Sequence, residues 1–576
     1  MDGSGQGDLR WAGLRWAGLG AIAGVLAGAA ALGVGQLVAG FTGASSSPVV
    51  AVGQLQIDLT PPWLKNFAIR EFGSHDKEVL VGGILVVLAI FAAVVGALAA
   101  RRLVFGMIGL AMFGAVGLTA AASRPTATFA SMLPTLAAIA TAVVTLWMLV
   151  SRIGPVVPVR VEQRTQQRRG TAELDAPDKW AGKPAGAGKP AGAGASARPA
   201  GKAGASDEAA GTWRGSAAWE EDAGRRGFIV AGAATAGTAA VAYLIGRGLT
   251  ERSSVAKVRS SLRIPAAAAP APPLPPGTSL NIPGITPFIT PNSKFYRVDT
   301  AIVIPEVSPD SWQLRIHGMV SRELTITFDE LIRRPLMEDY ITLCCVSNPV
   351  AGPYIGNAKW LGVSLASVLR QAGIKPGADQ LFCTSSDGFT SGTPVQTVMD
   401  GRDAMLAVSM NGQPLPVEHG FPVRMVVPGL YGYVSATKWV TDIEVTTFSG
   451  NYAFWATRGW SQQAPIKTEC RIDVPYGPQP PGKRLTVAGV AWAQHKGIDA
   501  VEIRVDGGPW SQARLASVPG IDTWRQWSAE WTTTTRGTHL IEARATDATG
   551  YTQTGVGEPP EPNGATGYPG VQVSVQ

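Results

Sequence analysis

Long apolar runs dominate the first half of the chain. Five of them approach or reach the ~20 residues that an α-helix needs to cross a bilayer. These runs are Trp16–Val38, Val79–Ala100, Leu103–Ala122, Phe129–Val150 and Phe228–Ile245. Gly and Ala, which let helices pack closely in lipid, are frequent in them. The pattern predicts a four-helix transmembrane region over 1–152 and a fifth transmembrane helix within 225–248.

Basic residues flank these runs in a consistent way. Arg10 and Arg15 precede the first run, Arg101-Arg102 separate the second from the third, a cluster from Arg152 to Arg169 follows the fourth, and Arg225-Arg226 precede the fifth. All of these fall on one side if the N-terminus is cytoplasmic, with Arg124 as the one exception. We therefore expect a multi-pass membrane protein with an extracytoplasmic C-terminal half.

The start of the fifth run carries a second signal. Arg225-Arg226, then Phe228 and a weakly hydrophobic stretch, resemble a twin-arginine export signal. The alternative is an ordinary positive flank of a membrane anchor. The export interpretation implies that the following domains cross the membrane folded, after loading a cofactor in the cytoplasm.

Two segments have the composition of linkers. Residues 153–224 contain a repeated Gly-Lys-Pro-Ala-Gly-Ala motif and are rich in Ala, Gly, Lys and Pro, which predicts a disordered linker. Residues 249–280 are Pro/Ala-rich around 266–276, which predicts an extended spacer that holds the exported part off the membrane.

From about residue 281 the sequence pattern is that of folded domains. Short β-branched runs predict strands at Thr300–Ile304, Trp312–Ile316, Leu324–Phe328, Tyr340–Leu343, Ala404–Met410, Val423–Val427 and Trp439–Val445. Apolar residues at helical spacing predict a helix over Ser364–Ala372, ended by Gly373. We expect an α+β domain over 281–472.

The last hundred residues alternate apolar and polar positions with period two. Leu485–Trp492, Ala500–Val505 and Leu540–Ala545 show this alternation, and Asp506-Gly507-Gly508 is a turn signal. The pattern predicts an all-β immunoglobulin-like sandwich over 473–576.

Composition excludes several classes of function. Four cysteines in 576 residues exclude a disulfide scaffold. The net charge of +7 arises beside apolar runs and in the linker, so the membrane explains it better than nucleic acid does. The chain has no Cys-x-x-Cys-His motif, and its five histidines, His75, His317, His419, His495 and His539, lie outside the apolar runs. We therefore expect no in-chain haem.

The candidate chemistry begins at Cys344-Cys345. These thiols end the Tyr340–Leu343 run and precede a Ser-Asn-Pro-Val-Ala-Gly-Pro loop. A thiol at a strand end is well placed to be a metal ligand or a nucleophile. The alternative is a buried cysteine that acts as a small apolar filler.

Motifs around and after these thiols carry a resemblance to a known family. They are Thr342-Leu-Cys-Cys-Val-Ser-Asn348, Ile355-Gly-Asn-Ala-Lys-Trp360, Asp387-Gly-Phe389, Met410-Asn-Gly-Gln-Pro-Leu-Pro416, His419-Gly-Phe-Pro-Val-Arg424, Val427-Pro-Gly429 and Lys438-Trp439. In this order they resemble the sulfite oxidase family of molybdenum enzymes, over residues 280–576. The sandwich resembles that family's C-terminal dimerisation domain.

The resemblance implies a molybdenum–molybdopterin cofactor in which a dithiolene gives two sulfurs and the protein gives one cysteine. Cys345 matches the position of the metal ligand. The positions that match cofactor contacts are Asn292, Arg297, Cys345, Asp387, His419, Arg424, Gly432 and Lys438. The phosphate and pterin of such a cofactor need cations, hydrogen-bond donors and close backbone approach.

Departures from the family pattern bear on the substrate. Where sulfite-oxidising members carry arginines after the ligand loop, this chain has Pro349 and Val350. Trp460 replaces a tyrosine near the metal, and Arg458 can partly compensate for the lost cations. We therefore expect Cys345, Arg297, Arg458 and Trp460 to form the catalytic group.

The resulting prediction is a membrane-anchored molybdopterin-dependent oxidoreductase. It transfers an oxygen atom on a small substrate, sulfite or a related compound, and exchanges single electrons with a separate carrier that is a cytochrome or is linked to quinones. The alternatives are a reductase of sulfoxides such as oxidised methionine, and a non-enzymatic surface protein whose sandwich binds a partner. The resemblance also implies a homodimer through the sandwich. Cys383 and Cys470 are either a disulfide or two buried thiols.

Overall fold

The computed structural model describes residues 4–43, 46–61, 76–123, 127–153, 212–252 and 255–576. The chain divides into two compact units. The first contains Met1–Val34, Leu85–Ala115 and Leu136–Tyr243, and the second contains Gly35–Ile84, Val116–Thr135 and Leu244–Gln576. The repeats of the predicted 153–224 linker and Arg124 lie outside the described residues.

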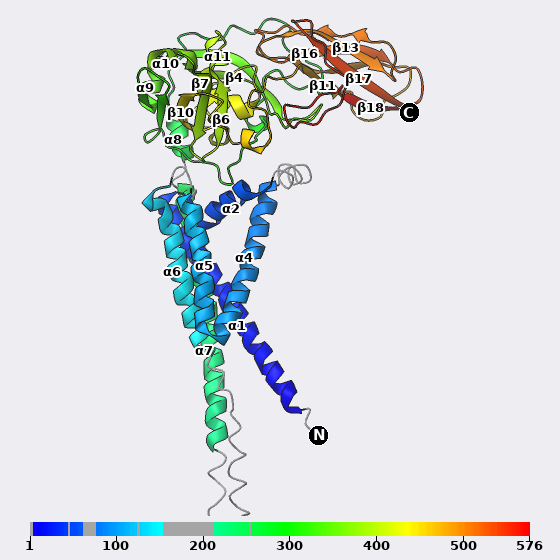
Figure 1. The fold of residues 1–576 in the computed structure, drawn as a ribbon. Coiled ribbons are helices and arrows are strands. Elements are labelled where there is room, and N and C mark those ends of the chain that lie inside the picture. The colour runs from blue at the N-terminus through cyan, green and yellow to red at the C-terminus, as the bar shows by residue number, and fades with distance from the viewer. Residues whose placement is uncertain (1–3, 44–45, 62–75, 124–126, 154–211, 253–254) are drawn as a thin grey trace, which may run out of the picture. The chain divides into compact units, whose positions relative to one another are not determined.

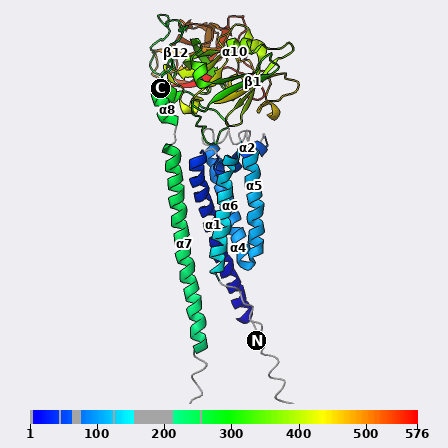
Figure 2. The same ribbon diagram turned by 90° about the vertical axis from the view of Figure 1, so that its left-hand side faces the viewer.

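Long helices form the N-terminal part of the chain (Figures 1 and 2). They are α1 (Ser4–Thr42), α4 (Asp76–Arg101), α5 (Leu103–Ala122), α6 (Phe129–Ser151) and α7 (Thr212–Arg252), with the shorter α2 (Pro48–Leu59) after α1. Within the described residues, five helices are long and apolar enough to cross a membrane: Trp16–Thr42, Val79–Arg101, Leu103–Ala122, Phe129–Ser151 and Arg226–Leu249. This confirms the five predicted apolar helices.

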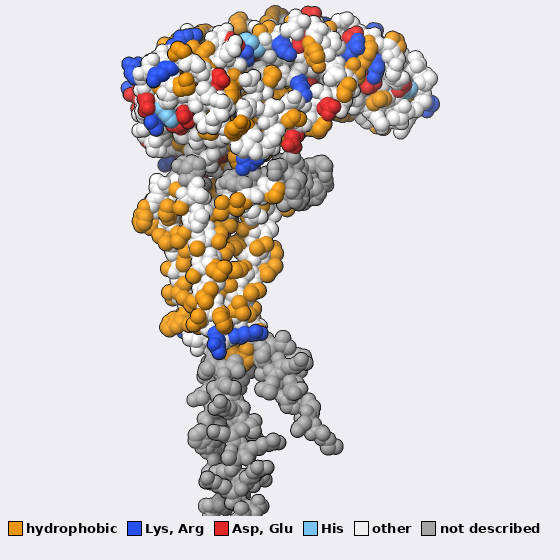
Figure 3. Space-filling model, in the orientation of Figure 1, with side chains coloured by type: hydrophobic (Ala, Val, Ile, Leu, Met, Phe, Trp, Pro, Cys, Tyr) orange, Lys and Arg blue, Asp and Glu red, His pale blue; other side chains and the backbone are white. Residues whose placement is uncertain are grey.

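Small residues bring the helices of the first unit together. A Cβ built on Gly24 of α1 would lie 1.9 Å from the carbonyl oxygen of Ala92 of α4, and one on Gly96 would lie 2.1 Å from the carbonyl oxygen of Gly20. Only glycine permits this approach of two backbones, as in membrane helix pairs. Outward-facing apolar side chains such as Val87 and Ile90 are more than half exposed, and apolar side chains cover the helices in Figure 3. Such a surface suits lipid.

Two predicted linkers differ from the structure. Helix α7 begins at Thr212, so the end of the predicted disordered segment is helical and Arg225-Arg226 lie inside the helix. The Pro/Ala-rich segment after α8 (Val255–Ser261) is extended, but it is not a free spacer. The backbone N–H groups of Ala268 and Ala269 donate to the carbonyl of Leu336 at 2.8 and 3.1 Å, so this segment belongs to the folded domain.

The α+β domain contains two sheets that share a core (Figure 1). The first has the order β2-β1-β10-β5-β6, and the second has β3-β4-β7-β8 with β9 paired to β7. The strands are β1 (Gln313–Gly318), β2 (Leu324–Thr327), β3 (Leu336–Cys344), β4 (Ile355–Ser364), β5 (Gln380–Ser385), β6 (Thr390–Pro394), β7 (Met405–Met410), β8 (Gln413–Pro414), β9 (Arg424–Val426) and β10 (Val440–Thr446). The short helices are α9 (Phe328–Ile332), α10 (Leu365–Ala372), α11 (Val395–Met399) and α12 (Gly432–Ser435).

Local sequence explains most of these elements. Ser364 caps α10 by accepting a hydrogen bond from the N–H of Ser367, and Gly373 ends the helix at φ 72°. The predicted strand at Thr300–Ile304 is wrong, because this segment has no strand partner and forms an irregular loop. Its β-branched residues fit a pleated surface, but β-propensity needs a neighbouring strand to take effect.

The C-terminal domain is a sandwich of two four-stranded sheets. Their orders are β11-β12-β16-β15 and β14-β13-β17-β18. The strands are β11 (Glu469–Val474), β12 (Arg484–Trp492), β13 (Ile498–Val505), β14 (Ser511–Gln512), β15 (Arg514–Leu515), β16 (Arg525–Thr532), β17 (Gly537–Asp547) and β18 (Gly570–Val575). Val487, Val501, Trp527 and Ile541 fill the core between the sheets. The predicted fold class, apolar helices followed by an α+β domain and an immunoglobulin-like β-sandwich, is confirmed.

Candidate functional site

The two adjacent thiols occupy different environments at the end of β3. Cys344 is completely buried in the domain core, whereas Cys345 is 9% exposed. The N–H of Cys345 donates to Tyr354 at 2.9 Å, and its carbonyl accepts from the N–H of Asn348 at 3.1 Å, which fixes the turn after the strand. Burial raises the pKa of Cys345, while hydrogen bonds from Ser347 and the charge of Lys438 oppose that rise. Cys345 is therefore the less buried of the two thiols and the one on which the charge of Lys438 acts.

Arg424 on β9 is a cation buried at 5% exposure. Its guanidinium donates to the carbonyl oxygens of His419 at 3.1 Å, Ala436 at 3.2 Å and Met425 at 3.4 Å, and it lies over the Trp360 ring at 5.1 Å. Burial lowers the pKa of Arg424 to about 10. Carbonyl oxygens satisfy its N–H groups but leave its charge uncompensated, which is costly in a buried place.

A single carboxylate serves two further cations. The carboxylate oxygen Oδ2 of Asp299 lies 2.7 Å from Lys438 Nζ and 2.9 Å from Arg297 Nε. The side chains of Asp299 and Lys438 are 4% and 10% exposed. Burial lowers the pKa of Lys438 to about 8, although the Asp299 charge acts in the opposite direction. The half-buried Asp387 is close enough for the charges of Asp299 and Lys438 to act on it, and burial raises the pKa of its carboxyl. The cluster therefore carries an excess of positive charge.

His419 completes this cluster as a neutral group. It is 3% exposed, and its Nε2 lies 3.2 Å from the carbonyl oxygen of Asn292, so that Nε2 carries the proton that is donated. Burial, followed by the charges of Arg424 and Lys438, lowers the pKa of His419 to about 4. Asn292 is held in turn by the side-chain amide of Asn411 at 2.7 Å.

Most of the predicted site residues lie together. Direct contacts join Asn292 to His419, His419 to Arg424, and Arg297 to Lys438 through Asp299. Gly432 begins α12, where a Cβ would lie 3.6 Å from the carbonyl oxygen of Cys344. Cys345 and Asp387 are linked to the cluster by the charge of Lys438.

Arg458 and Trp460 lie in a different setting. The guanidinium of Arg458 donates to the carbonyl of Phe454 at 2.6 Å and stacks on the ring of that residue at 3.6 Å. Trp460 packs against Trp455 and Tyr433, each with ring centroids 6.0 Å apart. Tyr433 belongs to α12, so Trp460 reaches the site through that helix. A catalytic role for both residues stays a prediction.

Two members of the cluster were not expected from the sequence. Asp299 is the shared counter-ion, and Tyr296 is a half-buried tyrosine whose phenol pKa is raised by desolvation and then by Cys345. Both stand in the segment Phe295-Tyr-Arg-Val-Asp299 that also holds Arg297. The only signal was a carboxylate two residues from an arginine, which does not reveal that Lys438 shares it.

Comparisons with known proteins place this site in a family. Residues 301–455 match the family model described as oxidoreductase molybdopterin binding domain. An uncharacterized oxidoreductase of Bacillus subtilis, YuiH, is 30% identical over 26% of this chain and 72% of its own length. Sulfite oxidase of Gallus gallus is 31% identical over 40% of this chain and 59% of its own length. This chain belongs to the sulfite oxidase family of molybdopterin-binding oxidoreductases.

The similarity to this family is partial in extent. The chain spans about half the length of the curated sulfite oxidases it matches, 59% of the Gallus gallus protein and 49% of the Rattus norvegicus protein. Among solved structures, the sulfane dehydrogenase SoxCD from Paracoccus pantotrophus is 26% identical, with a TM-score of 0.41 over 47% of this chain and 75% of that chain.

Membership of the sulfite oxidase family implies a molybdenum–pyranopterin cofactor, and the residues present fit it. The excess positive charge of Arg424, Lys438 and Arg297 suits an anionic phosphate. The side-chain Nδ2 of Asn348 is buried beside the Cys345 turn and has no hydrogen-bond partner within the described chain, so it is a donor ready for a polar ligand. Cys345 would offer a soft sulfur ligand to the metal of such a cofactor.

A first prediction concerns the buried charge of Arg424. We expect Arg424→Met to leave the cofactor-free protein as stable as the wild type or more stable, because it removes a buried charge that has no counter-ion. We expect the same variant to weaken cofactor retention by at least about tenfold, because the loss of one charge-assisted hydrogen bond costs ~1.5–3 kcal/mol of binding free energy. Thermal unfolding and pterin content of the purified chain measure the two effects.

Arg525 provides a matched control, because it also donates to carbonyl oxygens, those of Ala516 and Ile498, but in the sandwich. Arg525→Met should leave pterin content unchanged. Full cofactor content in Arg424→Met would contradict the assignment of Arg424.

Proposed function

We propose that the chain is a membrane-anchored molybdopterin oxidoreductase that transfers an oxygen atom to or from a small substrate. The observation that supports this most strongly is the cationic cluster in which the exposed Arg297 and the buried Lys438 share the buried Asp299, with buried Arg424 close by and with Cys345 under the influence of the Lys438 charge. Such a cluster is costly when empty and becomes favourable when it receives an anion with a soft metal.

The side chains have separate tasks in this proposal. Cys345 is the protein ligand of the metal; burial raises the pKa of its thiol, and the charge of Lys438 acts against that rise. Arg424 and Lys438 neutralise the phosphate of the cofactor. The neutral His419 accepts or donates hydrogen bonds without adding charge, and Tyr296 stays protonated as a donor because burial and Cys345 raise its pKa. When bound, the molybdenum cofactor supplies oxygen-atom transfer and electron exchange.

Sulfite or a related small oxyanion is our first candidate substrate, and the sulfite oxidases among the relatives support it. A neutral sulfoxide, such as oxidised methionine, is the second. It is favoured by the turn after Cys345, where Pro349 and Val350 carry no charge, and by the aromatic side chains of Trp455 and Trp460 near α12. Neutral groups of this kind neutralise a dianion poorly. In either case electrons pass to a separate carrier, a cytochrome or a quinone-linked protein.

The metal-ligand assignment has a direct test. We expect Cys345→Ser to abolish activity, because an alcohol replaces the soft sulfur ligand, while pterin remains bound through the cations. Cys344→Ser is the matched control, since Cys344 lies in the core and should leave activity measurable. Molybdenum content and activity are measured together on both variants. Full activity in Cys345→Ser with loss of activity in Cys344→Ser would reassign the ligand.

Assays in both directions test the substrate and the enzyme class. Oxidation of sulfite with ferricyanide should exceed background if the first candidate is right. Reduction of methionine sulfoxide with reduced viologen should exceed it if the second is right. Roughly one molybdenum atom per chain is expected in either case. Purified protein without molybdenum and without either activity would instead support the non-enzymatic surface protein.

We also propose that the N-terminus is cytoplasmic and the catalytic domain extracytoplasmic. Arg101 ends α4, Arg102 precedes α5 and Arg152 follows α6, so these exposed charges mark one end of the helices. A reporter enzyme that works only outside the cytoplasm should be active when it is fused after residue 576.

If export uses the paired arginines, the double variant Arg225→Lys with Arg226→Lys should keep the catalytic domain in the cytoplasm. Unchanged export in that double variant would show that the two arginines are only the positive flank of a membrane anchor.

A further inference from the structure

The strand that precedes Cys345, β3, is held by the sandwich domain. Thr342, three residues before Cys345, is completely buried. Its N–H donates to the carbonyl of Asp522 at 2.9 Å, and its carbonyl accepts from Gln494 Nε2 at 3.0 Å. Its hydroxyl accepts from the N–H of Trp524 at 2.8 Å. Three polar groups of one residue therefore depend on another domain.

The geometry of the sheet explains why these bonds matter. Strand β3 is an edge strand that pairs with β4, and Thr342 lies opposite Asn357. The backbone groups of Thr342 turn away from β4, so an uncovered edge would leave them unpaired. The hydroxyl of Thr342 also donates to Asn357 Oδ1 at 3.0 Å, which connects the sandwich contact to the next strand.

The same sandwich loop contacts the other side of the site. Gly429, at φ 83°, would place a Cβ 3.2 Å from His495 Cβ and 3.3 Å from the carbonyl oxygen of Gln494. Gly429 begins the loop that leads to Gly432 beside Cys344. The loop that carries Gln494 and His495 thus contacts both the strand before Cys345 and the loop that leads to Gly432 beside Cys344.

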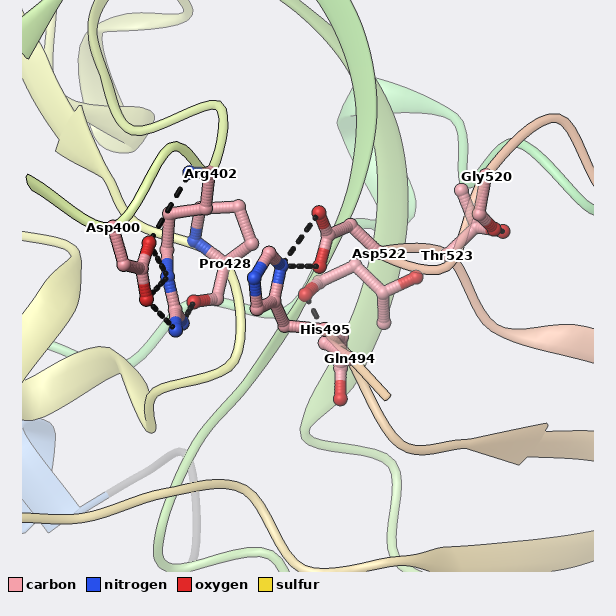
Figure 4. Close-up of polar contacts among 9 residues, drawn as sticks. Asp400, Arg402, Pro428, Gln494, His495, Gly520, Asp522 and Thr523 are labelled. Atoms are coloured by element: carbon pink, nitrogen blue, oxygen red, sulfur yellow. Dashed lines mark hydrogen bonds and ion pairs between the residues drawn. The ribbon is translucent and has the colours of Figure 1, made fainter. Parts of the chain in front are cut away.

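The contacting loops are themselves anchored. His495 Nδ1 lies 3.4 Å from the carboxylate of Asp522, and these residues are shown with Gln494 and Thr523 in Figure 4. The indole N–H of Trp524 donates to the carbonyl of Phe288 at 2.8 Å, and Trp524 is 1% exposed. Residues 494–495 and 522–524 therefore form a rigid support, which we call the sandwich clasp.

We propose that Gln494 is a positioning residue for Cys345, and that the sandwich clasp fixes the thiol by holding Thr342. The ligand role of Cys345 in this proposal rests on the proposed function. The positioning of its thiol by the clasp does not depend on that function. A ligand thiolate must be held within a fraction of an ångström of its metal. Loss of the Gln494 bond frees the end of β3 while both domains stay folded.

The reactivity of the four cysteines tests the proposal without metal. The full chain is produced free of cofactor in detergent and treated with iodoacetamide, and each cysteine peptide is quantified by mass spectrometry. We expect Gln494→Ala to raise the alkylation rate of Cys345 about fivefold, as one lost hydrogen bond should change a local opening equilibrium. Cys383 and Cys470, buried in the cores of the two domains, should react at wild-type rates.

Gln526 offers a matched control. It is fully buried in the sandwich and also bonds to the other domain, through the N–H of Leu280 at 2.8 Å and the carbonyl of Thr286 at 2.7 Å. Gln526→Ala therefore removes contacts between the same two domains far along the chain from β3. We expect it to leave the alkylation rate of Cys345 unchanged. Equal rates in Gln494→Ala and Gln526→Ala would overturn the proposal.

Faster alkylation of Cys383 or Cys470 in Gln494→Ala would show that this variant disturbs folding. In that case a second pair of variants tests the proposal. Thr342→Val removes the hydroxyl that accepts from Trp524, and Thr342→Ser keeps it. We expect faster Cys345 alkylation in the first and wild-type behaviour in the second. Identical behaviour of both would refute the clasp. Full activity in Cys345→Ser would contradict the ligand assignment. If the alkylation rates of Cys345 in the Gln494 and Thr342 variants still changed as expected, the proposal of the sandwich clasp would be supported independently.

Discussion

The buried positive charge around Lys438 and Arg424 is the constraint on which the rest of the catalytic domain depends. Desolvation lowers the pKa of both groups, and Asp299 compensates only part of the charge. A fold that keeps such a cluster must hold it by other means, and here the backbone does so. Carbonyl oxygens of His419, Ala436 and Met425 fix the guanidinium, and that of Glu418 accepts from Lys438. An arrangement of this kind suits the binding of an anion better than it suits the stability of the protein alone.

The two sheets explain how distant segments reach one place. Cys345 comes from the end of β3, Arg424 from β9 in the same sheet, and Lys438 from the residues just before β10 in the other sheet. Asn292, Tyr296 and Arg297 come from an irregular segment before the first strand. The site therefore lies where the ends of strands from both sheets meet an extended segment, a common arrangement for cofactor sites that combine several short motifs.

The sequence was most informative where one physical rule acts alone. Apolar length predicted the membrane helices, and Ser364 with Gly373 predicted the ends of α10. The residues of the cationic cluster could be predicted because the family motifs occur in this chain in the same order. The sharing of Asp299 could not be predicted, since it depends on two distant segments coming together.

The 300–304 segment had strand propensity without a strand partner. The composition of the Pro/Ala-rich segment predicts a spacer, because composition does not show that the N–H groups of Ala268 and Ala269 pair with Leu336. Cys383 and Cys470 are both free, each in its own core, as the buried-thiol alternative expects.

Two unrelated parts of the chain cover the outer edge of β3, one near its start and one near its end. Ala268 and Ala269 cover it near Leu336, and the sandwich clasp covers it at Thr342. An open edge strand is a template on which a second molecule can add its own strand. Proteins confined to a membrane meet one another at high local density, so a bare edge here would invite aggregation. Covering the edge at these points removes the unpaired backbone groups on which a second copy of the chain could add a strand.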